Sequence, residues 1–120
     1  MGVELRLTQA LKLLYEVSYD LVGDGKPELV PDFTLRQIAI LLTIYLDPPP
    51  HTVRGLAKKL RVTKPVITRA LDTLGKYDLV TRRRDELDLR NVVIQRTVKG
   101  ALYVEALGDN ISKRAAQLGP

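Results

Sequence analysis

The sequence contains no cysteine among its 120 residues. This absence excludes disulfide bonds, thiolate catalysis, zinc sites built on thiolates and thiol-based redox sensing. Histidine is almost as scarce, because His51 is the only imidazole, and it follows three prolines at positions 48–50 that indicate an extended connection. Since a lone histidine on a loop is more often solvated than a ligand or a base, we expect no metal site and no cofactor.

Long apolar runs are missing as well. The longest, Ile38–Leu46, already includes Thr43 and falls far short of the roughly 18 residues that span a bilayer. Glu4 and Arg6 interrupt the N-terminal segment where a secretory signal would need an apolar core. The sequence therefore predicts a cytoplasmic protein with no membrane partner.

Familiar catalytic patterns are also absent. The sequence has no glycine-rich phosphate loop and no set of serine, histidine and carboxylate in a known context, so we do not expect an enzyme. Acidic residues do gather around Gly23 and Gly25, but their spacing lacks the alternating oxygen ligands of a calcium loop. The residues that we expect to form a solvated loop instead are Asp20, Asp24, Glu28 and Asp32.

The sequence does have a local excess of positive charge. Residues 52–99 hold 13 lysines and arginines against 5 acidic residues, a net charge of +8, whereas the other residues hold 6 against 9, a net charge of −3. The length and the hydrophobic fraction of 45% suit one folded domain over residues 1–120. A basic region confined to part of such a domain is typical of a surface that docks on nucleic acid.

Hydrophobic spacing and capping residues predict the elements around this basic region. Residues that can cap the start of a helix are Thr34, Thr52, Thr63 and Thr97. We expect helices over residues 3–22, 35–46, 53–60, 64 to about 76 and 98–118, with strands at 79–84 and 92–97. The predicted fold is mostly α with a small β-hairpin wing, which is a winged helix-turn-helix.

The two terminal helices are more apolar than a helix with a single packing partner, since a surface helix normally shows one apolar stripe. We therefore expect a second subunit to cover a dimerisation region at residues 1–22 and 98–118, attached to a DNA-binding winged helix at 34–97. The apolar residues expected at the dimer interface are Leu7, Leu11, Leu14, Leu107, Ile111 and Leu118.

The helix that follows Thr63 divides into two faces. The residues expected to face inward are Val66, Ile67, Ala70, Leu71 and Leu74. The opposite face carries Lys64, Thr68, Arg69, Asp72 and Lys76. Such a helix fits the DNA major groove, with its polar face toward the bases.

Individual residues of this polar face have separate expected roles. Thr68 and Arg69 are placed to read bases, and Arg69 can donate two hydrogen bonds to a guanine. The alternative for Arg69 is an ion pair with Asp72, one turn further on. Thr63 and Lys64 lie at the helix N-terminus, where backbone amides and the helix dipole favour a phosphate.

Three arginines open the predicted hairpin, and successive residues of a strand point to opposite faces. We expect Arg82 and Arg84 to contact DNA or to form ion pairs within the wing, and Arg83 to lie on the other face. For each of these arginines, a solvated side chain is an equal alternative.

Many weak positions agree in order and spacing with one known family: Phe33-Thr34-Leu35-Arg36-Gln37, Leu56-Ala57, Leu60, Val66-Ile67-Thr68-Arg69-Ala70-Leu71-Asp72, Leu74, Leu79-Val80, Arg82, Arg83, Asp85, Asp88, Arg90, Thr97 and Gly100. On these residues the chain resembles the MarR family of bacterial and archaeal transcription regulators. The resemblance implies a homodimeric winged-helix repressor, often released from DNA by a small ligand. It also implies that Arg90 enters the minor groove and that Asp88 orients it. The chain departs from the family at Leu89, where an arginine is usual, and at Arg96, where an apolar residue is usual.

The sequence thus predicts a sequence-specific transcriptional regulator of double-stranded DNA. Its expected partners are a palindromic operator, a second copy of the chain and, as the resemblance implies, a small-molecule effector. The alternative is a winged-helix module that contacts another protein, because the fold alone does not exclude that use. The residues expected to contact DNA, or to orient a contact, are Thr63, Lys64, Thr68, Arg69, Arg82, Arg84, Asp88 and Arg90.

Overall fold

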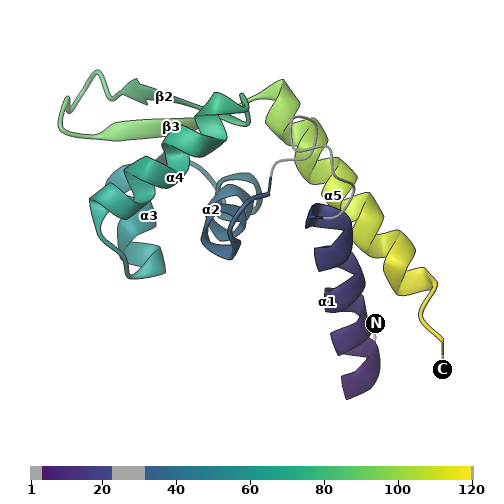
Figure 1. The fold of residues 1–120 in the computed structure, drawn as a ribbon. Helices are drawn as coiled ribbons and strands as arrows, with labels where there is room; N and C mark the ends of the chain where they lie inside the picture. The colour runs from purple at the N-terminus through teal and green to yellow at the C-terminus, as the bar shows by residue number, and fades with distance from the viewer. Residues whose placement is uncertain (1–3, 23–31, 120) are drawn as a thin grey trace. The chain divides into compact units, whose positions relative to one another are not determined.

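A computed structural model describes residues 4–22 and 32–119 (Figure 1). The chain divides into two compact units, one formed by residues 1–32 and 105–120 and the other by residues 33–104. The elements are α1 (Leu7–Val22), α2 (Leu35–Leu46), β1 (His51–Thr52), α3 (Val53–Leu60), α4 (Lys64–Lys76), β2 (Val80–Arg84), β3 (Val92–Arg96) and α5 (Val98–Ala116). None of the described helices is long and apolar enough to cross a membrane.

Three of the four predicted helix caps are confirmed, at Thr34, Thr52 and Thr97. Thr34 forms a capping box, because its hydroxyl accepts from the Gln37 amide at 3.1 Å while the Gln37 side chain accepts from the Thr34 amide at 2.9 Å. The hydroxyls of Thr52 and Thr97 each accept from the amide three residues further on, at 2.9 and 2.8 Å. Local hydrogen bonds of this kind fix where α2, α3 and α5 begin.

The core of the second unit lies among α2, α3, α4 and the sheet. The fully buried side chains are Ile40, Leu41, Ile44, Ile67, Leu71 and Leu74. Each such side chain stabilises the fold by about 1.5–3 kcal/mol relative to full exposure. Phe33 adds edge-on contacts with the rings of Tyr77 and Tyr103, whose centroids lie 5.7 and 6.0 Å away. This core fixes which face of α4 points outward.

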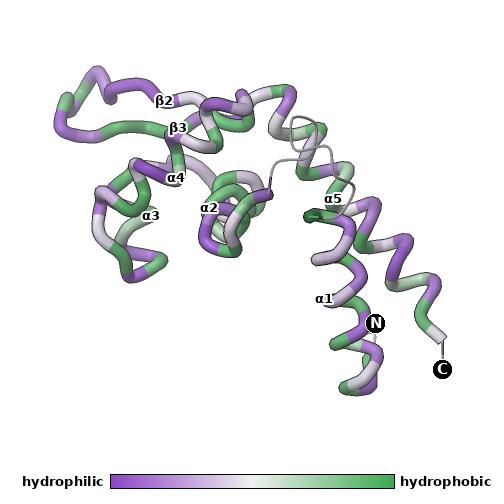
Figure 2. Tube along the Cα trace, in the orientation of Figure 1, coloured by the Kyte–Doolittle hydropathy of each residue, from purple (hydrophilic) through white to green (hydrophobic). Residues whose placement is uncertain are grey.

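The sheet contains the predicted hairpin and one strand that the sequence analysis missed. Its order is β1-β3-β2, with antiparallel pairing throughout. Figure 2 shows β3 as mostly hydrophobic and β2 as mostly hydrophilic. β1 has only two residues, which is too short for any periodicity to reveal.

The prediction that His51 is solvated on a loop is wrong. His51 belongs to β1, pairs with Ile94 of β3 and is only 8% exposed. Its Nε2 lies 3.1 Å from the carbonyl oxygen of Asp47. Because a carbonyl only accepts, Nε2 carries the hydrogen, and the imidazole acts as a structural donor.

The hydroxyl of Tyr45 joins three elements of the second unit. It donates to the carbonyl of Leu79 at 2.6 Å and accepts from the amide of Thr97 at 3.0 Å. A Cβ atom on Gly100 would lie 1.7 Å from this hydroxyl and 2.2 Å from the Leu79 carbonyl oxygen. Only glycine therefore lets α5 approach so closely.

In the first unit, an ion-pair cluster joins α1 to the C-terminal part of α5. The Arg114 guanidinium donates to both carboxylate oxygens of Asp20, at 2.6 and 2.8 Å, and to Glu16 at 3.3 Å. Asn110 donates to Asp20 at 2.9 Å. These hydrogen bonds, with that from Arg114 the strongest, lower the pKa of Asp20 to about 2, and they raise the pKa of Arg114.

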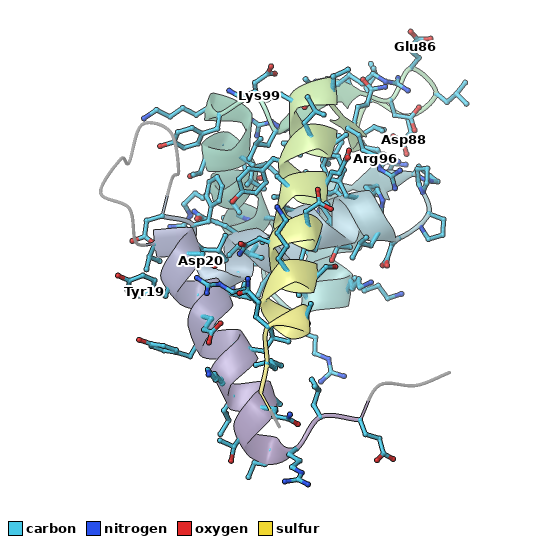
Figure 3. All side chains as sticks on the ribbon, turned by 90° about the vertical axis from the view of Figure 1, so that its right-hand side faces the viewer. Tyr19, Asp20, Glu86, Asp88, Arg96 and Lys99 are labelled. Carbon is cyan, nitrogen blue, oxygen red and sulfur yellow. The ribbon has the colours of Figure 1, made fainter. Side chains whose placement is uncertain are left out.

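The prediction that Asp20 belongs to a solvated acidic loop is therefore wrong, because Asp20 is a partly buried residue of α1 (Figure 3). Asp24 and Glu28 lie outside the described residues, and Asp32 is exposed. The terminal helices are also shorter than predicted, since α1 begins at Leu7 and α5 ends at Ala116. The predicted start of the first helix, Val3, lies outside the described residues.

Replacing Gly100 with alanine is expected to destabilise the protein by about 1–3 kcal/mol, the usual cost of forcing atoms into a packed site. The new methyl group would overlap the Tyr45 hydroxyl and the Leu79 carbonyl, which are hydrogen-bonded to each other. Urea unfolding measures the change. Gly108→Ala in α5 is the matched control: no described atom lies within 4 Å of a Cβ there, and alanine should add about 0.5–1 kcal/mol. Equal stability of Gly100→Ala and the wild type would contradict the close approach.

Replacing Asp20 with asparagine should give a pH-dependent loss of stability. The pKa of Asp20 is lower in the folded protein than its ordinary value of 3.8, so its charge stabilises the fold above that pH. This stabilisation is lost as the pH falls through about 2. The melting temperature of Asp20→Asn should therefore lie below that of the wild type at pH 7, and the difference should close near pH 2. A difference independent of pH, or an equal effect of Asp109→Asn, a substitution of an exposed carboxylate on α5, would argue against this role.

Candidate nucleic-acid interface

The structure divides α4 into the two predicted faces. Ile67, Ala70, Leu71 and Leu74 are buried and Val66 is half-buried, which confirms the inward face. The side chains on the opposite face are all exposed, namely Lys64, Thr68, Arg69, Asp72 and Lys76. Since the core holds the apolar face, this polar face is the part of α4 that a ligand can reach.

The N-terminus of α4 differs from the sequence expectation in one detail. Thr63 occupies the N-cap position with extended backbone angles, φ −80° and ψ 159°, but its hydroxyl forms no capping hydrogen bond. Pro65 falls in the first turn, as predicted. Pro65 has no N–H, and the amides of Val66 and Ile67 donate to the Thr63 carbonyl at 3.1 and 3.3 Å. The Lys64 amide and the Thr63 hydroxyl thus remain outside any cap, beside the exposed ammonium of Lys64. This combination attracts an anion, because amides and helix dipole add to the positive charge.

Arg69 is not paired with Asp72, the alternative considered from the sequence. Its Nε donates to the carbonyl of Pro65, one turn back, at 3.3 Å. Asp72 instead forms an ion pair with Nη2 of Arg82, at 2.8 Å. The guanidinium of Arg69 therefore keeps most of its donors for an external partner.

A groove of about 410 Å³ runs between the start of α2 and α4. Its lining residues are Thr34, Arg36, Gln37, Val66, Arg69, Ala70 and Thr73. Arg36 is exposed in the first turn of α2 and was not among the residues expected to contact DNA. The signal that could have found it is its place two residues after the Thr34 cap, because the first turn of a helix presents its side chains beside the free amides.

The three arginines of β2 alternate as predicted. Arg82 is paired in register with buried Ile94, and Arg83 with Val93, so Arg82 and Arg84 share the inner face of the sheet. Arg82 reaches Asp72 on α4, and Nη1 of Arg84 donates to the carbonyl of Leu89 at 2.8 Å. Both inner arginines therefore brace the hairpin against the helix or against its own loop.

The hairpin loop carries a well-defined ion pair. Nε and Nη2 of Arg90 donate to the two carboxylate oxygens of Asp88 at 3.0 and 3.1 Å, and the Arg90 amide donates to Oδ1 at 3.1 Å. The hydrogen bonds from Arg90 lower the pKa of Asp88, and Asp88 raises the pKa of Arg90. Asp88 and Arg90 thus form a two-pronged ion pair across Leu89, which is 64% exposed.

The candidate dimer residues differ in their exposure. Leu7, Leu11 and Leu14 are 79, 59 and 61% exposed on α1, and Ile111 is 38% exposed on α5. Leu118 is half-buried. Leu107 is only 9% exposed in the single chain, so it offers little surface to a second copy.

Two consecutive helices, α3 and α4, joined by a short turn and followed by a two-stranded hairpin define a winged helix-turn-helix protein. Comparison with known proteins gives the family. A sequence profile of the MarR family matches residues 33–92, which are 60 of the 120 residues. The chain therefore belongs to the MarR family of transcriptional regulators.

Individual relatives agree with this assignment. The organic hydroperoxide resistance transcriptional regulator of Bacillus subtilis strain 168 is 32% identical over 98 residues. That match covers 81% of this chain and 66% of the relative, just under two thirds of the relative's length. The S. aureus MepR–DNA complex has a TM-score of 0.70 at 26% identity, over 89% of this chain and 83% of that chain. The crystal structure of MarR has a TM-score of 0.66 at 23% identity, over 95% and 80%.

Proposed function

We propose that this regulator binds double-stranded DNA, with α4 in the major groove and the hairpin loop at the minor groove. The observation that carries the proposal is the exposed polar face of α4. There Arg69 has no ion-pair partner among the described residues, and the exposed ammonium of Lys64 stands at the helix start, beside a Thr63 hydroxyl that forms no cap. The MepR structure solved as a DNA complex supports the same use of the fold.

Each part of this surface has a distinct task in the proposal. Arg69 and Thr68 read base edges, because a guanidinium can donate twice to one guanine. Lys64 and the start of α4 hold a phosphate and fix the register without reading sequence. Arg90, oriented by Asp88, adds the minor-groove contact, and Leu89 contributes no charge where the family usually has an arginine.

The inner arginines of β2 contribute indirectly. Arg82 and Arg84 were candidates for DNA contact, but their guanidinium groups bind Asp72 and the Leu89 carbonyl. We propose that they hold the wing in shape, while its loop meets the DNA. An isolated two-stranded hairpin is only marginally stable in water, so such braces are useful.

We also propose that the functional unit is a homodimer. An apolar groove of about 300 Å³ in the first unit is lined by Leu5, Ala10, Leu13, Leu14, Val17 and Ile111. Leu7 and Leu11 extend this apolar surface along α1. Contiguous exposed apolar surface of this kind marks an interface, and a two-fold dimer requires a palindromic site.

The proposal places the protein in the cytoplasm, where its DNA target is, as a regulator and not as an enzyme. As the family resemblance implies, we propose that a small-molecule effector controls the binding of this regulator to DNA. The B. subtilis relative is named for organic hydroperoxide resistance. These 120 residues hold no cysteine, so any response of this chain to an effector cannot use thiol oxidation within them.

Three substitutions should separate base reading from phosphate binding. Arg69→Ala should lower the discrimination between specific and random duplex by about 1–3 kcal/mol, because it removes a base contact. Lys64→Ala and Arg90→Ala should weaken binding to all duplexes and reduce the slope of log affinity against log salt by about one each. Fluorescence anisotropy across a salt series measures both quantities.

Asp88→Ala is the control for the orientation of Arg90. It removes a negative charge near the DNA, so simple charge attraction predicts tighter binding, whereas loss of orientation predicts weaker binding. We expect weaker binding. Unchanged affinity and slope in the Arg69, Lys64 and Arg90 variants would exclude the assigned surface. No duplex binding by the wild type at low salt would favour the alternative, a protein-interaction module.

The homodimer predicts a particle of twice the chain mass at micromolar concentration, measured by light scattering after gel filtration. Leu11→Glu with Leu14→Glu should shift it to the monomer, because two buried carboxylates would be costly at an apolar interface. Thr8→Glu, an exposed polar position on the same helix, is the matched control and should stay dimeric. A wild-type monomer at this concentration would overturn the proposal.

A further inference from the structure

Arg96 occupies a strand position at which an apolar side chain would be the usual residue. It ends β3, pairs in register with Val80, and lies two residues after Ile94, on the same face of the strand. Val80 and Ile94 are 2 and 4% exposed. Arg96 itself is exposed, so its guanidinium can reach over the edge of this buried pair to groups on a neighbouring element.

The partners of Arg96 are the free carbonyls at the end of α2. Nε donates to the carbonyl of Ile44 at 2.8 Å, and Nη2 donates to the carbonyl of Asp47 at 2.9 Å. The guanidinium carbon also lies 5.8 Å from the centroid of the Tyr45 ring. The last carbonyls of a helix have no partner within the helix, and a cation there also interacts favourably with the helix dipole. Arg96 thus caps α2 from the base of the hairpin.

Other elements meet at the same end of α2. The Asp47 carbonyl also accepts from Nε2 of His51, on β1, at 3.1 Å. The Asp47 carboxylate forms an ion pair with the ammonium of Lys59, on α3. Asp47 is therefore the residue at which α2, α3, β1 and β3 meet. Of its three partners named here, only Arg96 belongs to the wing hairpin.

We propose that Arg96 is a positioning residue that fixes the direction of the wing, and thereby the place of Arg90, by capping α2. The proposal rests on the proposed function for the contact of Arg90 with DNA. Arg96 ends β3 at the base of the hairpin, and Asp88 lies in the loop between β2 and β3; Figure 3 labels both residues. The strands advance about 3.3 Å per residue, so a small rotation at the base moves the loop by a larger distance. The planar fork of arginine holds two carbonyls at once, which a lysine cannot reproduce.

The test is a double-mutant cycle in DNA binding. Arg96→Met, which keeps the length of the stem but removes the donors, should lower affinity about tenfold when Arg90 is present. It should change affinity less than about twofold in the Arg90→Ala protein, because the contact that it positions is already gone. Arg96→Lys, which keeps the charge, should lose most of the affinity that Arg96→Met loses. Lys99→Met, in the first turn of α5, removes one exposed charge as a control and should bind nearly as the wild type does.

Additive losses in the cycle would overturn the proposal, since they would mean that Arg96 acts independently of Arg90. Full binding by Arg96→Lys would overturn it too, because charge alone would then suffice. Amide hydrogen exchange on the free protein gives a readout that does not depend on DNA. In Arg96→Met, exchange should quicken about tenfold along β2 and β3 while the buried turns of α4 stay protected. If Arg90→Ala alone leaves binding unchanged, the wing contact of the proposed function fails, whereas the exchange result still decides whether Arg96 anchors the hairpin.

Discussion

The hydroxyl of Tyr45 is the interaction on which the second unit depends. It holds the carbonyl of Leu79, where the hairpin begins, and the amide of Thr97, where the hairpin ends and α5 starts. A partly buried hydroxyl that both donates and accepts fixes its neighbours more tightly than apolar packing, because hydrogen bonds are directional. The close approach of Gly100 to the same oxygen leaves no room for another arrangement. The base of the wing and the start of α5 are therefore set by one side chain of α2.

The basic residues of the second unit divide into two groups: those bound to other groups of the protein and those exposed to solvent. Arg82, Arg84 and Arg96 bind an acidic side chain or backbone carbonyls of the protein, so they shape the wing and join it to α2 and α4. Lys64 and Arg69 stay exposed on α4. A count of charges treats the groups alike. The distinction matters because a guanidinium that already donates to the protein has fewer donors left for a phosphate or a base.

The elements that the sequence predicted well are those whose signals are local. Thr34, Thr52 and Thr97 cap their helices as expected, and the inward stripe of α4 follows from its 3.6-residue period. The hairpin strands were placed to within one residue. The failures concern contacts between distant residues. No local pattern could reveal that His51 pairs with Ile94, or that Asp72 chooses Arg82 instead of Arg69.

By itself, the sequence determined the order of the helices, the exposed face of α4, the basic surface and the family of the chain. These properties depend on spacing and composition, which a linear sequence contains. Only the tertiary structure decided which charged groups are bound within the protein. Arg96 and Asp47 are 49 residues apart, and Asp20 and Arg114 are 94 apart. The pairing of such groups depends on where folding places them, because hydrogen bonds and ion pairs act only over a few ångströms.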